Sequence, residues 1–171
     1  MLGLMAAGAS ASALIASTRA NDVAGVKAAL EGGADINERE PSSGQTALMA
    51  GTLAGSSAAV KLLLEKGADK TIGENDGFTP VHGAGFQGRA DLLVLFANHG
   101  IDLHAVHSKD QFQGYHRACW GGEQRHTDTV AMFIELGVDP GVRGGNPAKT
   151  CGEMTSNKGT RALLLKLADE V

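Results

Sequence analysis

Gly77-Phe78-Thr79-Pro80-Val81-His82-Gly83-Ala84 is the stretch that decides the fold, because altered copies of it recur along the chain. Thr46 precedes Thr79 by 33 residues, and His116 follows His82 by 34 residues. A second marker, a Gly-x-Asp triplet that follows an apolar run, recurs with a similar period. It is present at Gly33-Ala34-Asp35, Gly67-Ala68-Asp69, Gly100-Ile101-Asp102 and Gly137-Val138-Asp139. Two markers with one period indicate a repeat protein whose units bury their apolar faces only against neighbouring units.

The chemistry of this stretch predicts two helices and a turn in each unit. Thr79 is placed to cap a helix with its hydroxyl, and Pro80 suits the first helical position, where a missing N–H costs nothing. Gly88 ends this helix, and residues 91–98 carry leucines and a phenylalanine at three- and four-residue intervals, which is typical of an amphipathic helix. Gly100 ends the second helix, and the loop that follows is rich in Gly, Asp and Asn.

The repeated pattern resembles the ankyrin repeat family, whose unit reads Gly-x-Thr-Pro-Leu-His-x-Ala, then Gly, then Val-x-x-Leu-Leu, then Gly-Ala-Asp. The resemblance covers nearly the whole chain, and it implies an all-α solenoid of stacked helix-turn-helix units with hairpin-like loops. It also implies that His82 and His116 are structural residues, which hydrogen-bond between adjacent units. We expect a single domain over 1–171, with units at about 10–37, 41–70, 74–103, 108–140 and 146–171.

The two outer units depart from the pattern in ways that suit capping units. In the first unit, Leu14 and Ile15 are expected in the core, and Asn21 replaces the usual turn glycine. In the last unit we expect Thr150 to start a helix and Gly159 to form the turn. The polar segment 155–158 suits an exposed outer face.

Unit four departs most from the pattern. Gln111 replaces Gly, and Gln113-Gly114 replaces Thr-Pro. Three extra residues within 123–128 either lengthen a helix or form a small bulge. Gly114 in the first helical turn is expected to weaken its helix by up to about 1 kcal/mol relative to Ala. We therefore expect unit four to have the lowest local stability of the five units.

Composition narrows the classes of function. The net charge of −4 gives no electrostatic footprint for nucleic acid or for a membrane surface. The 171 residues contain no linker rich in Pro, Ser or charge that would divide them. We expect a monomer inside the cell, in the cytoplasm.

The six histidines and two cysteines raise the question of a metal site or a catalytic site. Candidate ligands are His104 and His107 with His99, or His116 with Cys119, but these spacings match no standard metal site. Two cysteines are too few for a disulfide scaffold, and the repeat register supplies no base for a catalytic thiol. We expect buried thiols at Cys119 and Cys151, no cofactor, no metal and no enzymatic activity.

The N-terminal segment 1–16 is apolar and small, and Ala9-Ser10-Ala11 resembles a signal-peptide cleavage site. The segment carries no Lys or Arg, and it runs directly into the first repeat helix. It is also too short to span a bilayer. A cap helix is the favoured interpretation.

In proteins with this repeat, partners usually contact the loop tips and the inner surface of the first helices. Two residues before the turn glycine, the three middle units carry Leu53, Phe86 and Trp120, while the residues just before the helix starts include Phe78 and Phe112. Grouped aromatic side chains of this kind are enriched in binding hot spots, although an aromatic residue at these positions can also simply cover a loop.

We therefore predict a non-catalytic adaptor, scaffold or inhibitor that binds another protein through its concave face and loop tips. The predicted binding residues are Leu53, Phe78, Phe86, Phe112, Trp120, Asp76, Asp110, Arg19 and Lys149. The alternative is a sensor for a small ligand or a metal that uses the histidines of units three and four.

Overall fold

The computed structural model describes the backbone of residues 7–169 and the side chains of residues 13–169, and this part of the chain folds into helices joined by turns and loops. In chain order the helices are α1 (Ala7–Arg19), α2 (Val23–Glu31), α3 (Ala47–Ala54), α4 (Ser57–Glu65), α5 (Pro80–Gln87), α6 (Ala90–Asn98), α7 (Gly114–Cys119), α8 (Gln124–Glu135), α9 (Cys151–Met154) and α10 (Lys158–Asp169). Within residues 7–169 the only β-type pairings are two isolated bridges, Val106 with Gln113 and Gly144 with Lys149. The predicted all-α class of helix-turn-helix units is confirmed.

The chain divides into two compact units, Met1–Pro80 and Val81–Val171. The boundary falls at the start of α5. The single domain expected from the sequence stays a prediction.

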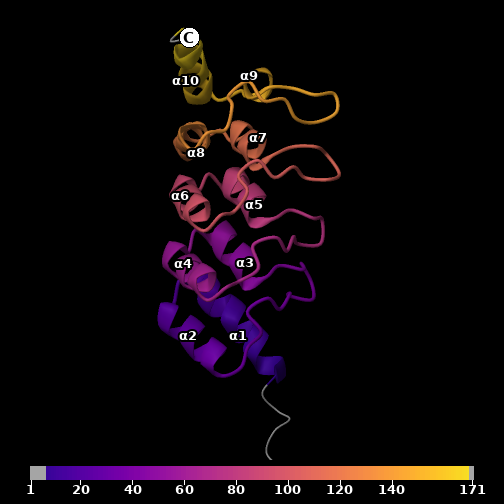
Figure 1. Ribbon diagram of the computed structural model, residues 1–171, viewed down its shortest axis with the longest axis vertical. Coiled ribbons are helices and arrows are strands. Elements are labelled where there is room, and N and C mark those ends of the chain that lie inside the picture. The colour runs from indigo at the N-terminus through magenta and orange to yellow at the C-terminus, as the bar shows by residue number, and fades with distance from the viewer. Residues whose placement is uncertain (1–6, 170–171) are drawn as a thin grey trace, which may run out of the picture. The chain divides into compact units, whose positions relative to one another are not determined.

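In the first compact unit, α1 pairs with α2 and α3 pairs with α4 (Figure 1). Leu14, Val26, Leu48 and Leu63 are buried between these helices, so the cap helix contributes to the core as predicted. The Thr46 hydroxyl accepts a hydrogen bond from the Met49 backbone N–H at 3.2 Å, which is the cap that the repeated threonine predicts. Residues 1–6 of the apolar N-terminal segment lie outside the described residues.

In the second compact unit, α8 packs against α6, α7 and α10, and α7 packs against α9. Figure 1 shows α6, α8 and α10 in one layer, with the loops that precede α7 and α9 extending away from that layer. The core includes Phe96, Tyr115 and Phe133, all fully buried. The ring of Tyr115 meets the ring of Phe133 edge to face at 6.1 Å.

The three extra residues of unit four lengthen a helix. Helix α8 has 12 residues, whereas α4 and α6 have 9 each. Of the two alternatives that the sequence left open, the lengthened helix is therefore the one present.

Gly114 has a role that helix propensity does not reveal. A side chain on Gly114 would collide with the Val81 carbonyl oxygen, and a side chain on Gly85 would collide with the Gly114 carbonyl oxygen. The backbones of α5 and α7 therefore touch directly at these two glycines. The expectation that Gly114 weakens unit four considered only the isolated helix and left this contact out.

The last helix pair differs from the sequence expectation at Gly159. This glycine lies inside the first turn of α10, and α9 is only four residues long. The Asn157 side-chain oxygen accepts hydrogen bonds from the Gly159 and Thr160 N–H groups at 2.9 and 3.3 Å, so Asn157 caps α10. Thr150 starts α9 as predicted, and its hydroxyl accepts from the Glu153 N–H at 3.3 Å.

Candidate functional site

The loop before α7 is held by the carboxylate of Asp110. One oxygen accepts from His107 Nδ1 at 2.9 Å and from the Phe112 N–H at 3.2 Å, and the other accepts from the Arg117 guanidinium. Partial burial alone would raise the pKa of Asp110, but these hydrogen bonds outweigh it and hold the pKa below its usual range. Asp110 was predicted as a binding residue at a loop tip, and its carboxylate is occupied within the chain.

Two aromatic side chains and one arginine form a rigid cluster beside this loop. The rings of Phe112 and Trp120 meet edge to face, with their centroids 4.9 Å apart. The buried Arg117 guanidinium lies 4.8 Å from the Trp120 ring centroid and 5.5 Å from that of Phe112. Because Asp110 holds Arg117, both rings are supported from behind by a fixed cation.

A pocket of about 560 Å³ opens beside the two rings. Residues of the loop and helix of unit four line it together with residues of unit five. The lining residues are Lys109, Asp110, Phe112, Trp120, Asn146, Pro147, Lys149, Glu153 and Met154. Four residues that the sequence predicted for binding therefore share one pocket, namely Asp110, Phe112, Trp120 and Lys149.

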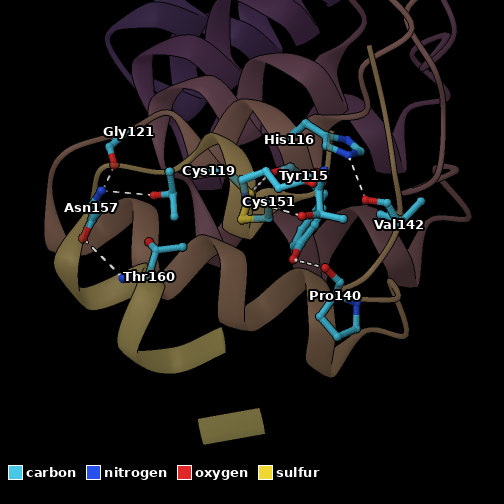
Figure 2. The surroundings of a disulfide bond; sticks show 12 residues. Tyr115, His116, Cys119, Gly121, Pro140, Val142, Cys151, Asn157 and Thr160 are labelled. Atoms are coloured by element: carbon cyan, nitrogen blue, oxygen red, sulfur yellow. Dashed lines mark hydrogen bonds between the residues drawn. A yellow bond between two sulfur atoms is a disulfide. The ribbon is translucent and has the colours of Figure 1, made fainter. Parts of the chain in front are cut away.

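A disulfide bond joins Cys119 to Cys151 (Figure 2), and both cysteines are close in sequence to residues that line this pocket. The expectation of buried thiols is therefore wrong about their redox state, although both side chains are fully buried. Cys119 directly precedes Trp120, and Cys151 lies between Lys149 and Glu153 in the sequence. The bond thus ties the two sides of the pocket together. A signal for it was present, since the separation of 32 residues is close to one repeat period.

His116 links unit four to the loop before unit five (Figure 2). Its Nδ1 accepts from the Gln113 N–H at 3.3 Å, so the proton is on Nε2, which donates to the Val142 carbonyl at 3.2 Å. Burial lowers the pKa of His116 and keeps the ring neutral. The inter-unit hydrogen bond that the resemblance implied for this histidine is present.

Phe86 and Trp120 are the large side chains most available to a partner near the helix ends of the second compact unit. Their exposed fractions are 60% and 43%. The buried ring of His126 lies between these helix ends, because its Nε2 donates to the Phe86 carbonyl at 3.2 Å and its ring fills the space beside Gly121. Sequence reasoning did not identify this role of His126.

The remaining predicted binding residues lie in the first compact unit. Leu53 and Phe78 are half-buried there, and Asp76 is exposed. Arg19 forms an ion pair with Glu40 at 3.0 Å and hydrogen-bonds Gln45 at 3.1 Å. A single strip along all five repeats stays a prediction, because its members belong to two compact units.

The histidines form no metal site within the described part of the chain. Among residues 13–169 no three His, Cys, Asp or Glu side chains gather in a way that could hold an ion. In one proposed pair, His116 uses both ring nitrogens within the fold and Cys119 is in the disulfide.

Comparison with known families agrees with the helix pairs. Residues 4–74 match the family model described as ankyrin repeats, in three copies. Residues 4–74 of this chain are therefore ankyrin repeats. No curated protein sequence matches this chain.

Ankyrin repeats are generally protein–protein interaction modules and are typically non-catalytic. No helix among residues 7–169 is long and apolar enough to cross a membrane. The pocket residues Asn146, Pro147, Glu153 and Met154 were not predicted, because they lie in the irregular last unit, where the repeat register gives no guide. Arg117 was missed for a similar reason, since its contacts depend on how the loop returns onto α7.

Proposed function

We propose that this ankyrin-repeat protein is a non-catalytic interaction module, an adaptor, scaffold or inhibitor, that binds a protein partner through first-helix ends and loop tips. The exposure of Phe86 and Trp120 carries the proposal. Large aromatic side chains are enriched among the residues that contribute most to binding, and their exposure lowers solubility. The predicted binding residues Phe112 and Lys149 border the same surface at the pocket.

The local structure supports a preformed contact surface. Arg117 and Phe112 fix one face and one edge of the Trp120 ring, and His126 fixes the backbone beneath Phe86. Side chains that are already held lose little conformational entropy when a partner binds. This arrangement favours a binding role for the aromatic cluster over simple coverage of a loop.

The alternative function, a histidine-based sensor for a metal or small ligand, has weaker support. His116 and His126 make hydrogen bonds that connect neighbouring repeats, and His107 bonds Asp110. Using these rings as ligands would break contacts that hold the fold.

Affinity capture tests the proposal. The wild-type chain, a Phe86→Ala/Trp120→Ala variant and a Val94→Ala/Leu165→Ala control, which truncates exposed residues on α6 and α10, are compared by mass spectrometry. We expect at least one protein to be captured by the wild type and the control and lost with the aromatic variant. Equal capture by all three chains would contradict the proposed surface.

The disulfide gives information about the cellular compartment of the protein. Such bonds persist in oxidising compartments and are rare in the cytosol. We propose an oxidising compartment in place of the cytoplasm that the sequence suggested. Maleimide labelling of Cys119 and Cys151 after rapid denaturing lysis tests this, and full labelling of both thiols would restore the cytoplasmic prediction.

A further inference from the structure

We propose that the pocket beside Phe112 and Trp120 binds a large apolar side chain of a partner peptide that carries acidic residues next to it. This inference rests on the proposed function and specifies the chemistry of its partner. It is carried by the lining of the pocket and by the balance of charges around it.

The pocket is large enough to hold an anchoring side chain, and part of its wall is apolar. Its volume of about 560 Å³ lies within the range of small-ligand pockets, roughly 300 to 1,000 Å³. Phe112, Trp120, Pro147 and Met154 supply apolar surface. The disulfide and the Arg117–Asp110 pair fix residues on both sides, so the pocket exists before a ligand binds.

The two carboxylates that line the pocket are already engaged. Asp110 binds Arg117 and His107, as described above. Glu153 accepts from the Thr150 N–H at 2.7 Å, which contributes most to lowering its pKa, and it pairs with Arg143 at 3.2 Å. Each of the two carboxylates therefore already has a cationic partner within the chain.

The surrounding charge favours an anionic ligand. Arg117 and Arg143 pair with the two carboxylates, and the ammonium of Lys149 adds a positive charge to the lining of the pocket. Within residues 13–169 the exposed Lys149 ammonium forms no ion pair. The pocket is thus locally positive on a chain with a net charge of −4.

A cationic ligand would meet repulsion at this site. The Trp120 ring already has Arg117 over it, and Lys109 and Lys149 line the same space. A basic peptide or a methylated lysine would have to enter beside Arg117 and Lys149. An acidic residue beside an apolar anchor can instead pair with Lys149 while the anchor contacts the rings.

Trp120 provides the readout, because it is the one tryptophan of the chain. Three blocked nonapeptides without tryptophan are titrated: a phenylalanine flanked by glutamates, a phenylalanine flanked by lysines, and an alanine flanked by glutamates. We expect the first to shift Trp120 emission and to bind at least about tenfold more tightly than the other two. Lys149→Glu should weaken its binding by about tenfold, while Lys158→Glu, with the same charge change outside the pocket, should leave it unchanged.

Several outcomes would overturn the inference. With the peptides, these outcomes are tighter binding of the lysine-flanked peptide or no emission change with any peptide. With the variants, the outcome is an equal effect of the two charge reversals. An emission change with protein concentration alone would also overturn it, because it would indicate that a second copy occupies the pocket. If the peptides fail while the Phe86→Ala/Trp120→Ala variant still loses its captured partner, the peptide chemistry is wrong and the proposed function stands. If capture is also unchanged, both fail.

Discussion

At the residue scale, the irregular unit four has Gln111 at a position where the repeat normally has glycine. Gln111 occupies the position of Gly44 and Gly77, and all three residues have a positive φ, of 62°, 69° and 93°. A residue with a Cβ atom is strained in this left-handed conformation, by roughly 1 to 2 kcal/mol. Gln111 therefore keeps the loop geometry at a cost in stability.

Gln111→Gly should stabilise the second compact unit. Relief of the backbone strain is partly offset by the larger entropy of glycine in the unfolded chain, which leaves a gain of about 0.5–1 kcal/mol. Urea unfolding followed by Trp120 emission measures the change. Gly137→Ala is the matched reverse variant, because Gly137 has φ 96° and open space around the position of a Cβ atom, so it should lose stability. A stability loss in Gln111→Gly would contradict this account.

His82 should make stability depend on pH. Burial, with repulsion from His107 and Arg117, lowers its pKa from 6.5 to about 4 in the folded protein. The unfolded chain then binds more protons between these two values, so the stability from neutral His82 is complete above pH 6.5 and is lost as pH falls toward 4. We expect the free energy of unfolding to be about 2 kcal/mol lower at pH 5 than at pH 7 from this residue.

The control for this pH effect is His82→Met, since Met49 occupies the same position of the preceding repeat. The variant should retain only the smaller part of the pH dependence that other groups supply, including His116, whose pKa burial also lowers. Urea unfolding at pH 7 and pH 5 measures the difference for both chains. An unchanged pH dependence in His82→Met would exclude His82 as its source.

At the scale of elements, the helices could be predicted from the sequence wherever the repeated residues act locally. Thr46 and Thr150 cap helices through their own hydroxyls, and Gly88 and Gly100 follow helices with a positive φ. Contacts between elements could not be predicted in the same way. The Asp110–Arg117 pair and the pocket depend on the path of irregular loops.

Gly114→Ala separates local propensity from packing. Propensity alone predicts a gain of up to about 1 kcal/mol for the helix. The direct contact between the backbones of α5 and α7 predicts the opposite, a loss of about 1–3 kcal/mol, because the added methyl would push the helices apart. Thermal or urea unfolding decides between these two signs, and a stabilised variant would show that the contact relaxes easily.

The disulfide should contribute strongly to the second compact unit. Its cysteines are 32 residues apart, and closing a loop of that length restricts the unfolded chain by about 3–4 kcal/mol. Adding reductant should therefore lower the urea midpoint of the wild type. A Cys119→Ala/Cys151→Ala variant should have a low midpoint that reductant does not change. If the reductant has no effect on the wild type, the bond does not contribute to stability.

At the scale of the whole molecule, the chain combines regular repeats with irregular surface features, where we propose that a partner binds. The regular positions bury leucines, valines and phenylalanines between helices, and they say little about a partner. Phe86, Trp120 and the pocket residues lie where units four and five depart from the pattern or where a first helix ends. The proposed function therefore depends on surface residues that the repeat itself does not require.

The most direct test is the affinity of a captured partner for the wild-type chain and for Phe86→Ala/Trp120→Ala, measured by isothermal titration calorimetry. Each of the two residues should contribute as a hot spot, so the double variant should bind at least about 100-fold more weakly. Its helix content should stay close to that of the wild type, because neither side chain is part of the buried core between the helices. Equal affinities of the two chains would contradict the central claim that these aromatic residues form the interaction surface.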